Sequence, residues 1–192
     1  MAPRKPEAIV DEMFLKRWSP RAMSNEEVSD EELMSLFEAA KWAPSSNNNQ
    51  PWRFVYAKRN SQYWDTFVGF LNEGNRIWAK RAAVLIVTVS NTLFDFDHKF
   101  SRTHSFDCGA SWMSLAFQGA IMGLVVHAMQ GFNYEDATQK LHVPFGFQVE
   151  AMIAVGKPGK KDDLPKALQK REYPSERKTL KEIAFEGKFK RQ

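Results

Sequence analysis

Apolar residues recur at helical spacing in six stretches of the chain. In the first stretch, Ile9, Met13 and Phe14 fall on one helical face. In the second, Ser29 and Glu32 form a capping box ahead of a periodic apolar face, so a helix is expected to start there. The predicted helices cover residues 6–17, the stretch from Ser29 to just before Pro44, and residues 61–72, 75–80, 106–123 and 134–141.

Shorter apolar runs between these helices predict strands. The run Val84–Val89 is rich in β-branched residues and has no polar alternation, as in a strand buried on both faces. Strands are expected around residues 54–56 and at 84–89, 124–129 and 148–155. Helix and strand alternate loosely, which favours one domain with four core strands. The stretch 91–104 has three phenylalanines but no clean period, so we expect a loop or an irregular lid.

Length, cysteine content and charge distribution narrow the class of protein. A chain of 192 residues with 43% hydrophobic residues can bury one core and is not intrinsically disordered. The lone Cys108 excludes a disulfide within the chain and a Cys-rich metal centre, and it fits a reducing compartment. Residues 157–192 carry 12 Lys and Arg against 6 Asp and Glu, so the net charge of this segment is +6, whereas that of the whole chain is +4. Its three prolines predict an extended C-terminal arm, 157–192, on a single domain, 1–192.

Neither the N-terminus nor the apolar runs predict export or membrane insertion. No apolar core follows Arg4 and Lys5, so we expect no signal peptide. The run Ala120–Met129 is interrupted by Gly123 and His127 and is too short to span a bilayer. A cytoplasmic location without a membrane partner is therefore expected.

Three short segments carry polar chemistry, and each has a second interpretation. Lys16–Arg21 places three cations and a serine hydroxyl within six residues, which suits a phosphate or a solvated helix end. Ser45–Gln50 offers six consecutive uncharged polar side chains, which suit either a heterocycle or an ordinary surface loop. His127–Gly131 ends a strand with glycine, which permits close approach of a ligand or a plain turn.

Other candidate chemistries fit less well. Cys108 follows Asp107 and His104, but inside a helix a buried small apolar side chain is the better interpretation than a nucleophile. The spacing of His98 and His104 matches no common zinc pattern, so we expect no metal. The chain lacks Gly-x-Gly-x-x-Gly, Walker and Gly-x-Ser-x-Gly motifs. No base-stacking motif accompanies the basic arm, so nucleic acid is not expected as a partner.

Taken in chain order, the three polar segments share their sequence and separation with one known family. The segments are Arg17-Trp-Ser-Pro-Arg21, Ala43-Pro-Ser-Ser-Asn-Asn-Asn-Gln-Pro-Trp-Arg-Phe54 and Gly123-Leu-Val-Val-His-Ala-Met-Gln-Gly-Phe132. The chain resembles the FMN-dependent nitroreductase family over residues 8–187. The pattern Ala-Pro-Ser-Ser-x-x-x-Gln-Pro-Trp is the most specific part, and Pro174–Ile183 is similar to the family's C-terminal segment.

The resemblance implies an α+β fold with a mostly antiparallel central sheet wrapped by helices. It also implies an intertwined homodimer with two FMN sites at the interface, and residues 106–123 would form the dimer core. In the implied ping-pong reaction, hydride passes from NADH or NADPH to flavin N5, and from there to nitroaromatics, quinones or similar electron-poor acceptors. No side chain is expected to act as a catalytic group, because FMN carries the redox chemistry.

The resemblance also implies which residues bind FMN. Arg17 and Arg177 would bind the phosphate, which needs full charge pairing when buried. Arg21 would reach the N1/O2 edge, where a cation stabilises the reduced flavin. The other implied flavin contacts are Trp18, Ser19 and Asn75; the backbone of Ala128, Met129, Gln130 and Gly131; and, from the partner subunit, Pro44, Ser45, Ser46 and Asn48, with Gln50 adjacent.

Two departures from the family pattern bear on substrate choice. Little chain lies between Ser90 and Ser105 to build a long lid, so Phe94, Phe96, Phe100 and His104 would shape a more open site. Trp18 stands where a smaller or polar residue is commoner. The alternatives are a reductase of one metabolite, such as an activated alkene or aldehyde, and a flavin-binding protein without turnover.

Overall fold

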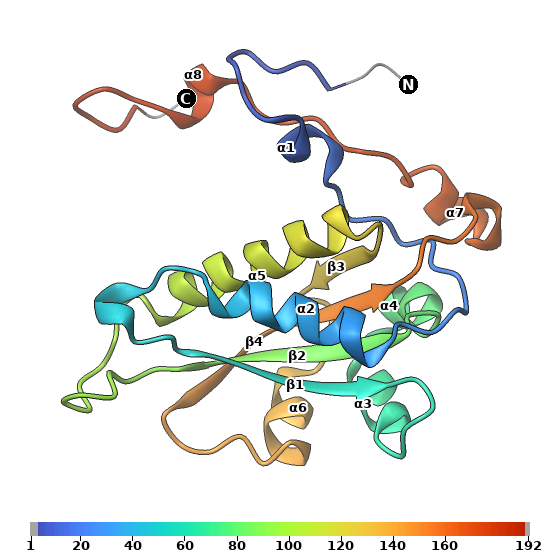
Figure 1. The fold of residues 1–192 in the computed structure, drawn as a ribbon, viewed down its shortest axis with the longest axis horizontal. Helices are drawn as coiled ribbons and strands as arrows, with labels where there is room; N and C mark the ends of the chain where they lie inside the picture. The colour runs from blue at the N-terminus through green and yellow to red at the C-terminus, as the bar shows by residue number, and fades with distance from the viewer. Residues whose placement is uncertain (1–3, 191–192) are drawn as a thin grey trace.

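The computed structural model describes residues 4–190, and its centre is a four-stranded sheet (Figure 1). The strands are β1 (Trp52–Lys58), β2 (Val84–Asn91), β3 (Val125–Met129) and β4 (Phe147–Gly156). They lie in the order β1-β2-β4-β3, and each neighbouring pair is antiparallel. The predicted α+β class, the four strands and the antiparallel sheet are confirmed.

Helices cover both faces of the sheet. Their bounds are α1 Glu12–Lys16, α2 Asp30–Lys41, η1 Ser46–Asn48, α3 Trp64–Phe70, α4 Glu73–Ala79, α5 His104–Ile121, α6 Tyr134–Lys140, η2 Lys161–Asp163, α7 Lys166–Gln169 and α8 Leu180–Ile183. Leu85 and Val87 of β2 pack in one cluster with residues of α3, α4 and α6. Val84 and Ile86 pack in a second cluster with residues of α2 and α5. Because both faces of β2 are covered, its sequence is apolar throughout rather than alternating.

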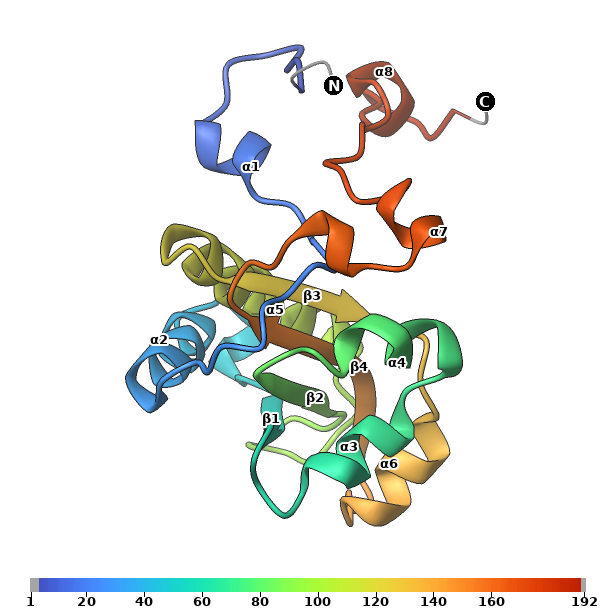
Figure 2. The ribbon, with the colours of Figure 1, turned by 90° about the vertical axis from the view of Figure 1, so that its right-hand side faces the viewer.

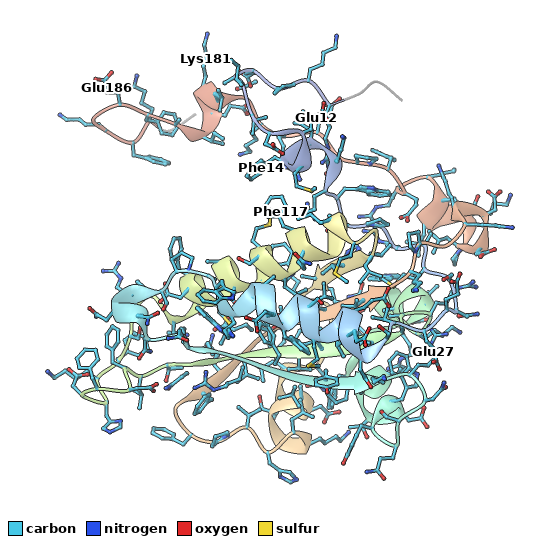
Figure 3. All side chains as sticks on the ribbon, in the orientation of Figure 1. Glu12, Phe14, Glu27, Phe117, Lys181 and Glu186 are labelled. Atoms are coloured by element: carbon cyan, nitrogen blue, oxygen red, sulfur yellow. The ribbon has the colours of Figure 1, made fainter. Side chains whose placement is uncertain are left out.

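The two ends of the chain leave this layered body together. In Figures 1 and 2, α1, α7 and α8 lie on the side of α5 away from the sheet. Phe14 of α1 packs edge-on against Phe117 of α5, with 4.9 Å between ring centroids (Figure 3). Within residues 157–190 the arm is mostly irregular, but it contains η2, α7 and α8, which the expectation of an extended segment did not include.

The prediction of a helix over residues 6–17 is wrong in extent. Helix α1 begins only at Glu12, because the Asp11 side chain accepts a hydrogen bond from Met13 N and caps the helix there. Ile9, which the prediction placed on the buried face, is fully exposed in the chain.

The remaining predicted elements need smaller adjustments. The capping box of Ser29 and Glu32 is present at the start of α2. The stretch 61–72 holds only the seven residues of α3, and Asn72 caps α4 rather than ending α3. The irregular segment expected at 91–104 is present until His104 starts α5, and an isolated bridge pairs Leu93 with Phe100.

Candidate functional site

Two arginines from opposite ends of the chain meet beside α1. Arg17 follows the last residue of α1, and Arg177 lies in the arm between α7 and α8. Burial lowers the pKa of Arg17, and the like charges of Arg177 and Arg4 lower this pKa further. Among residues 4–190, none of these three guanidinium groups has an ion-pair partner. Repelling cations without a carboxylate partner suit a dianion such as a phosphate.

Arg21 is held by a buried carboxylate of the arm. Glu172 Oε1 accepts hydrogen bonds from the backbone N of Arg21, at 2.7 Å, and of Ala22, at 2.8 Å. Its Oε2 lies 3.9 Å from Arg21 Nη1 and has no hydrogen-bond partner in the described chain. Burial lowers the pKa of Arg21, and Glu172 opposes that change. The carboxylate therefore holds both the backbone and the charge of Arg21 in place.

Strand β3 contacts the segment from Arg17 to Arg21 through His127. His127 Nδ1 lies 2.8 Å from the Pro20 carbonyl oxygen, and because that oxygen only accepts, the nitrogen must donate. Burial lowers the pKa of His127 to about 4, although the hydrogen bond to Pro20 opposes this shift. The imidazole is therefore neutral at pH 7, and it places Ser19 and Arg21 beside β3.

Asn75, for which the resemblance implied a flavin contact, reaches the end of β3 in this chain. Its Nδ2 donates to Gly131 O at 3.0 Å, and Asn72 N donates to the same oxygen at 3.1 Å. A Cβ on residue 131 would stand 2.5 Å from Asn72 Nδ2 and 2.6 Å from Asn75 Nδ2. A side chain at residue 131 would therefore displace these two amide groups from their present positions. Ala128 is half-buried, Met129 buried and Gln130 exposed, so the strand end runs from the core to the surface.

The polar loop is an ordered structure rather than a simple turn. Asn47, Asn48 and Gln50 all adopt positive φ angles, which asparagine tolerates better than most residues and which glutamine adopts rarely. Ser45 Oγ accepts from Gln50 N, and Asn48 O accepts from Gln50 Nε2. These contacts fix the loop from within.

Two residues outside the predicted set fasten this loop to the body. Asp107 Oδ2 of α5 accepts from Ser46 N at 3.1 Å. The buried Asn49 donates from Nδ2 to Leu93 O and accepts from Asp95 N. The loop is thus tied to the start of α5 and to the segment after β2, and Pro44 and Asn48 remain exposed.

The chain brings some predicted site residues together and separates others. Arg17, Ser19 and Arg177 gather around the end of α1, and Trp18 lines a cavity of about 380 Å³ beside Glu172, the residue that also holds Arg21. Helix η1, which carries the polar loop, lies at the left end of Figure 1, whereas α4 lies at the right end. No described hydrogen bond or ion pair joins residues 44–50 to residues 17–21 or 127–131. One chain therefore holds two parts of the predicted site far apart.

Arg4, Glu172 and Asp107 were not identified from the sequence, and Asn49 was identified only as one of the six polar residues of the loop. Each acts through a tertiary contact, and Arg4, Glu172 and Asp107 belong to no recognisable motif. Cys108 was expected to be a buried small side chain, and it is: burial, with Glu150 and Asp107 nearby, raises its pKa to about 12. Among residues 4–190, no group of three or more His, Cys, Asp or Glu side chains is placed to hold a metal. No helix in that range is long and apolar enough to cross a membrane.

Comparison with known proteins connects this geometry to a family. The nitroreductase family model matches residues 15–68, which include Arg17 and the polar loop. A solved oxidoreductase containing FMN is 45% identical, with a TM-score of 0.94 over 98% of this chain and 97% of that chain. A Desulfovibrio desulfuricans protein provisionally named a nitroreductase, solved in complex with FMN, is 23% identical, with a TM-score of 0.73 over 93% and 96% of the two chains.

A Streptomyces coelicolor protein provisionally named an NADH dehydrogenase/NAD(P)H nitroreductase is 30% identical over 98 residues. This alignment covers 51% of the present chain and 45% of that relative, so it spans about half the length of each. The full-length likeness to the solved oxidoreductase and the matching family model agree with the α+β fold described above. The chain therefore belongs to the nitroreductase family.

Proposed function

We propose that this protein is an FMN-dependent oxidoreductase that transfers hydride from NADH or NADPH to electron-poor acceptors such as nitroaromatics and quinones. The observation that carries the proposal is the meeting of Arg17 and Arg177 at the end of α1, where Arg4 bonds both the Arg17 oxygen and the Ser175 oxygen that Arg177 also binds. These are the two residues for which the resemblance implied phosphate binding. The FMN in the 45% identical solved relative supports the same cofactor here.

The proposed site follows the segment from Arg17 to Arg21 and continues to the end of β3. Arg17 and Arg177 would pair with the phosphate, and Ser19, with its Oγ 3.3 Å from Arg17 Nη1, lies beside them. Arg21, held by Glu172, would face the pyrimidine edge of the flavin, where a cation stabilises added negative charge. Asn75 and the backbone of residues 128–131 would line the ring. FMN, when bound, supplies reversible two-electron chemistry, so no side chain has to act as nucleophile.

We further propose that the polar loop serves the site of a second subunit in a homodimer. The segment around η1, which carries Pro44, Ser45, Ser46, Asn48 and Gln50, lies at the opposite end of the chain's body from α4 (Figure 1). A site shared between two subunits would bring this segment to the flavin. Large apolar side chains are exposed on α5, among them Phe106 and Ile121, and Trp42 is exposed directly after α2. Exposed apolar groups of this size are typical of a subunit interface.

The proposed electron donor is a nicotinamide nucleotide. The name of the Streptomyces coelicolor relative, an NADH dehydrogenase/NAD(P)H nitroreductase, supports this donor. Phe96 and Phe100 are exposed on the short segment after β2, where they would be available to contact an apolar acceptor. A single domain with an arm at 157–192, and a cytoplasmic location, stay predictions from the sequence.

Bleaching of the flavin is the direct test of an oxidoreductase. We expect purified full-length protein to be yellow, to release FMN on heating, and to lose its flavin absorbance when mixed anaerobically with NADH or NADPH. A later addition of a quinone or nitroaromatic should restore the absorbance. If neither nucleotide bleaches the bound FMN, the protein is a flavin binder without turnover, and the proposed reaction is wrong.

Substitution of the two arginines tests the phosphate assignment. Arg17→Ala and Arg177→Ala should each weaken FMN binding by about tenfold or more, since a hydrogen bond to a charged group contributes about 1.5–3 kcal/mol. The measurement is the dissociation constant of FMN from flavin fluorescence. Lys166→Ala removes an exposed cation of the same arm and serves as the control. Equal affinity in wild type and both arginine variants would contradict the assignment.

A further inference from the structure

The N-terminal segment contributes a third arginine to the cationic cluster at the end of α1. Arg4 Nη1 donates to the backbone oxygens of Leu15 and Arg17, both at 2.9 Å. Its Nε donates to Ser175 O of the arm at 3.0 Å. The side chain therefore spans from the last turn of α1 to the segment that carries Arg177.

Arg4 and Arg177 converge on a single acceptor. Arg177 Nη1 donates to the same Ser175 oxygen at 3.2 Å, so the two guanidinium groups lie side by side. Burial lowers the pKa of Arg4, and the charge of Arg177 lowers it further. Holding two like charges this close costs free energy unless an anion lies between them.

The hydrogen-bonding capacity of Arg4 is not exhausted. Nε and Nη1 are engaged by backbone oxygens, and Nη2 makes no hydrogen bond within residues 4–190. No carboxylate of that range forms an ion pair with Arg4. The bonds of Nε and Nη1 fix the planar guanidinium in place, and Nη2 is left to donate to an oxyanion.

We propose that Arg4 is a phosphate-binding residue, which completes a three-arginine site for the phosphate monoester of FMN together with Arg17 and Arg177. This inference rests on the proposed function and adds to it. Two arginines match the charge of a phosphate dianion, and the third makes the site strongly selective for the phosphorylated flavin over riboflavin. The bound phosphate also joins the N-terminal segment to the C-terminal arm.

Riboflavin separates phosphate binding from a purely structural role, because it has the same ring and ribityl chain without the phosphate. Flavin-depleted full-length wild type, Arg4→Ala and Arg4→Lys are titrated with FMN and with riboflavin. We expect Arg4→Ala to weaken FMN about 10- to 100-fold, to change riboflavin less than about twofold, and Arg4→Lys to fall between. Lys5→Ala, which removes the neighbouring exposed cation, should bind both flavins as wild type does.

Three results would overturn the proposal. FMN affinity of Arg4→Ala equal to wild type would show that Arg4 does not contact the phosphate. An equal loss for both flavins would show that Arg4 only fastens the two ends of the chain. Wild type that binds neither flavin would overturn the proposed function as well.

The salt dependence of FMN binding is a second measurement that does not need riboflavin. With one cation fewer, the dissociation constant of Arg4→Ala should rise less steeply with KCl concentration than that of wild type. Identical slopes would also count against the proposal.

Discussion

Replacing Gly159 with alanine is expected to lower the melting temperature by roughly 6–12 °C, the consequence of a destabilisation of about 3 kcal/mol in a chain of this size. Residues 157–159 pair with residues 22–24: Ser24 N donates to Lys157 O, and Gly159 N donates to Ala22 O. A Cβ on residue 159 would stand 2.4 Å from the Met23 carbonyl carbon and 2.7 Å from Ser24 N. Because these are backbone atoms, no rotamer change relieves the clash.

The strain at this position should also reach the candidate site. The segment displaced from Gly159 continues into Ala22 and Arg21, whose backbone nitrogens bind Glu172. We therefore expect weaker FMN retention together with the lower melting temperature. Gly69→Ala is the matched control, since a Cβ at this position near the end of α3 would meet nothing within 4 Å, and the change should stabilise the protein slightly. Similar melting temperatures for Gly159→Ala and wild type would show that the two segments separate freely.

The sequence predicted correctly those elements whose signal is contained in a short stretch of residues. Val84–Val89 was identified as a buried strand because β2 is covered on two faces, which leaves no polar alternation in the sequence. The capping box at Ser29 located the start of α2, since both of its hydrogen bonds are local. The helix predicted over 6–17 failed at its start because the apolar period there has no core beneath it: Ile9 is exposed, whereas Phe14, inside α1, packs against Phe117 of α5.

In the candidate site, too, the residues of continuous motifs were predicted, and the residues that meet only in the folded chain were not. The polar loop and the Arg17–Arg21 segment are continuous motifs, so a resemblance could identify them. Residue spacing alone did not bring Arg17 and Arg177 together, because they are 160 positions apart in the sequence. Arg4 and Glu172 were missed because their roles depend on which segment each one faces, and an isolated charged residue gives no sign of that in the sequence.

Acidification is expected to destabilise the protein through His127. Burial lowers the pKa of His127 to about 4 in the folded chain, whereas an unfolded histidine titrates near 6.5. A folded pKa below the unfolded one stabilises the protein fully above about pH 6.5, and this contribution is lost as pH falls toward 4. The difference corresponds to on the order of 3 kcal/mol across that window.

Protonation of His127 would also affect the arginines beside it. Protonation would add a cation next to Arg21 and Arg17, whose charges already disfavour it. Urea unfolding of wild type and His127→Gln at pH 7, 5.5 and 4.5 measures the effect, since glutamine retains a donor for the Pro20 oxygen but does not titrate. The free energy of unfolding of wild type should fall by roughly 2–3 kcal/mol more than that of the variant between pH 7 and 4.5.

His98→Gln, at an exposed histidine, should follow wild type. If wild type and His127→Gln lose stability in parallel, then His127 is not buried as a neutral donor, and another group holds Pro20 and Arg21 in place.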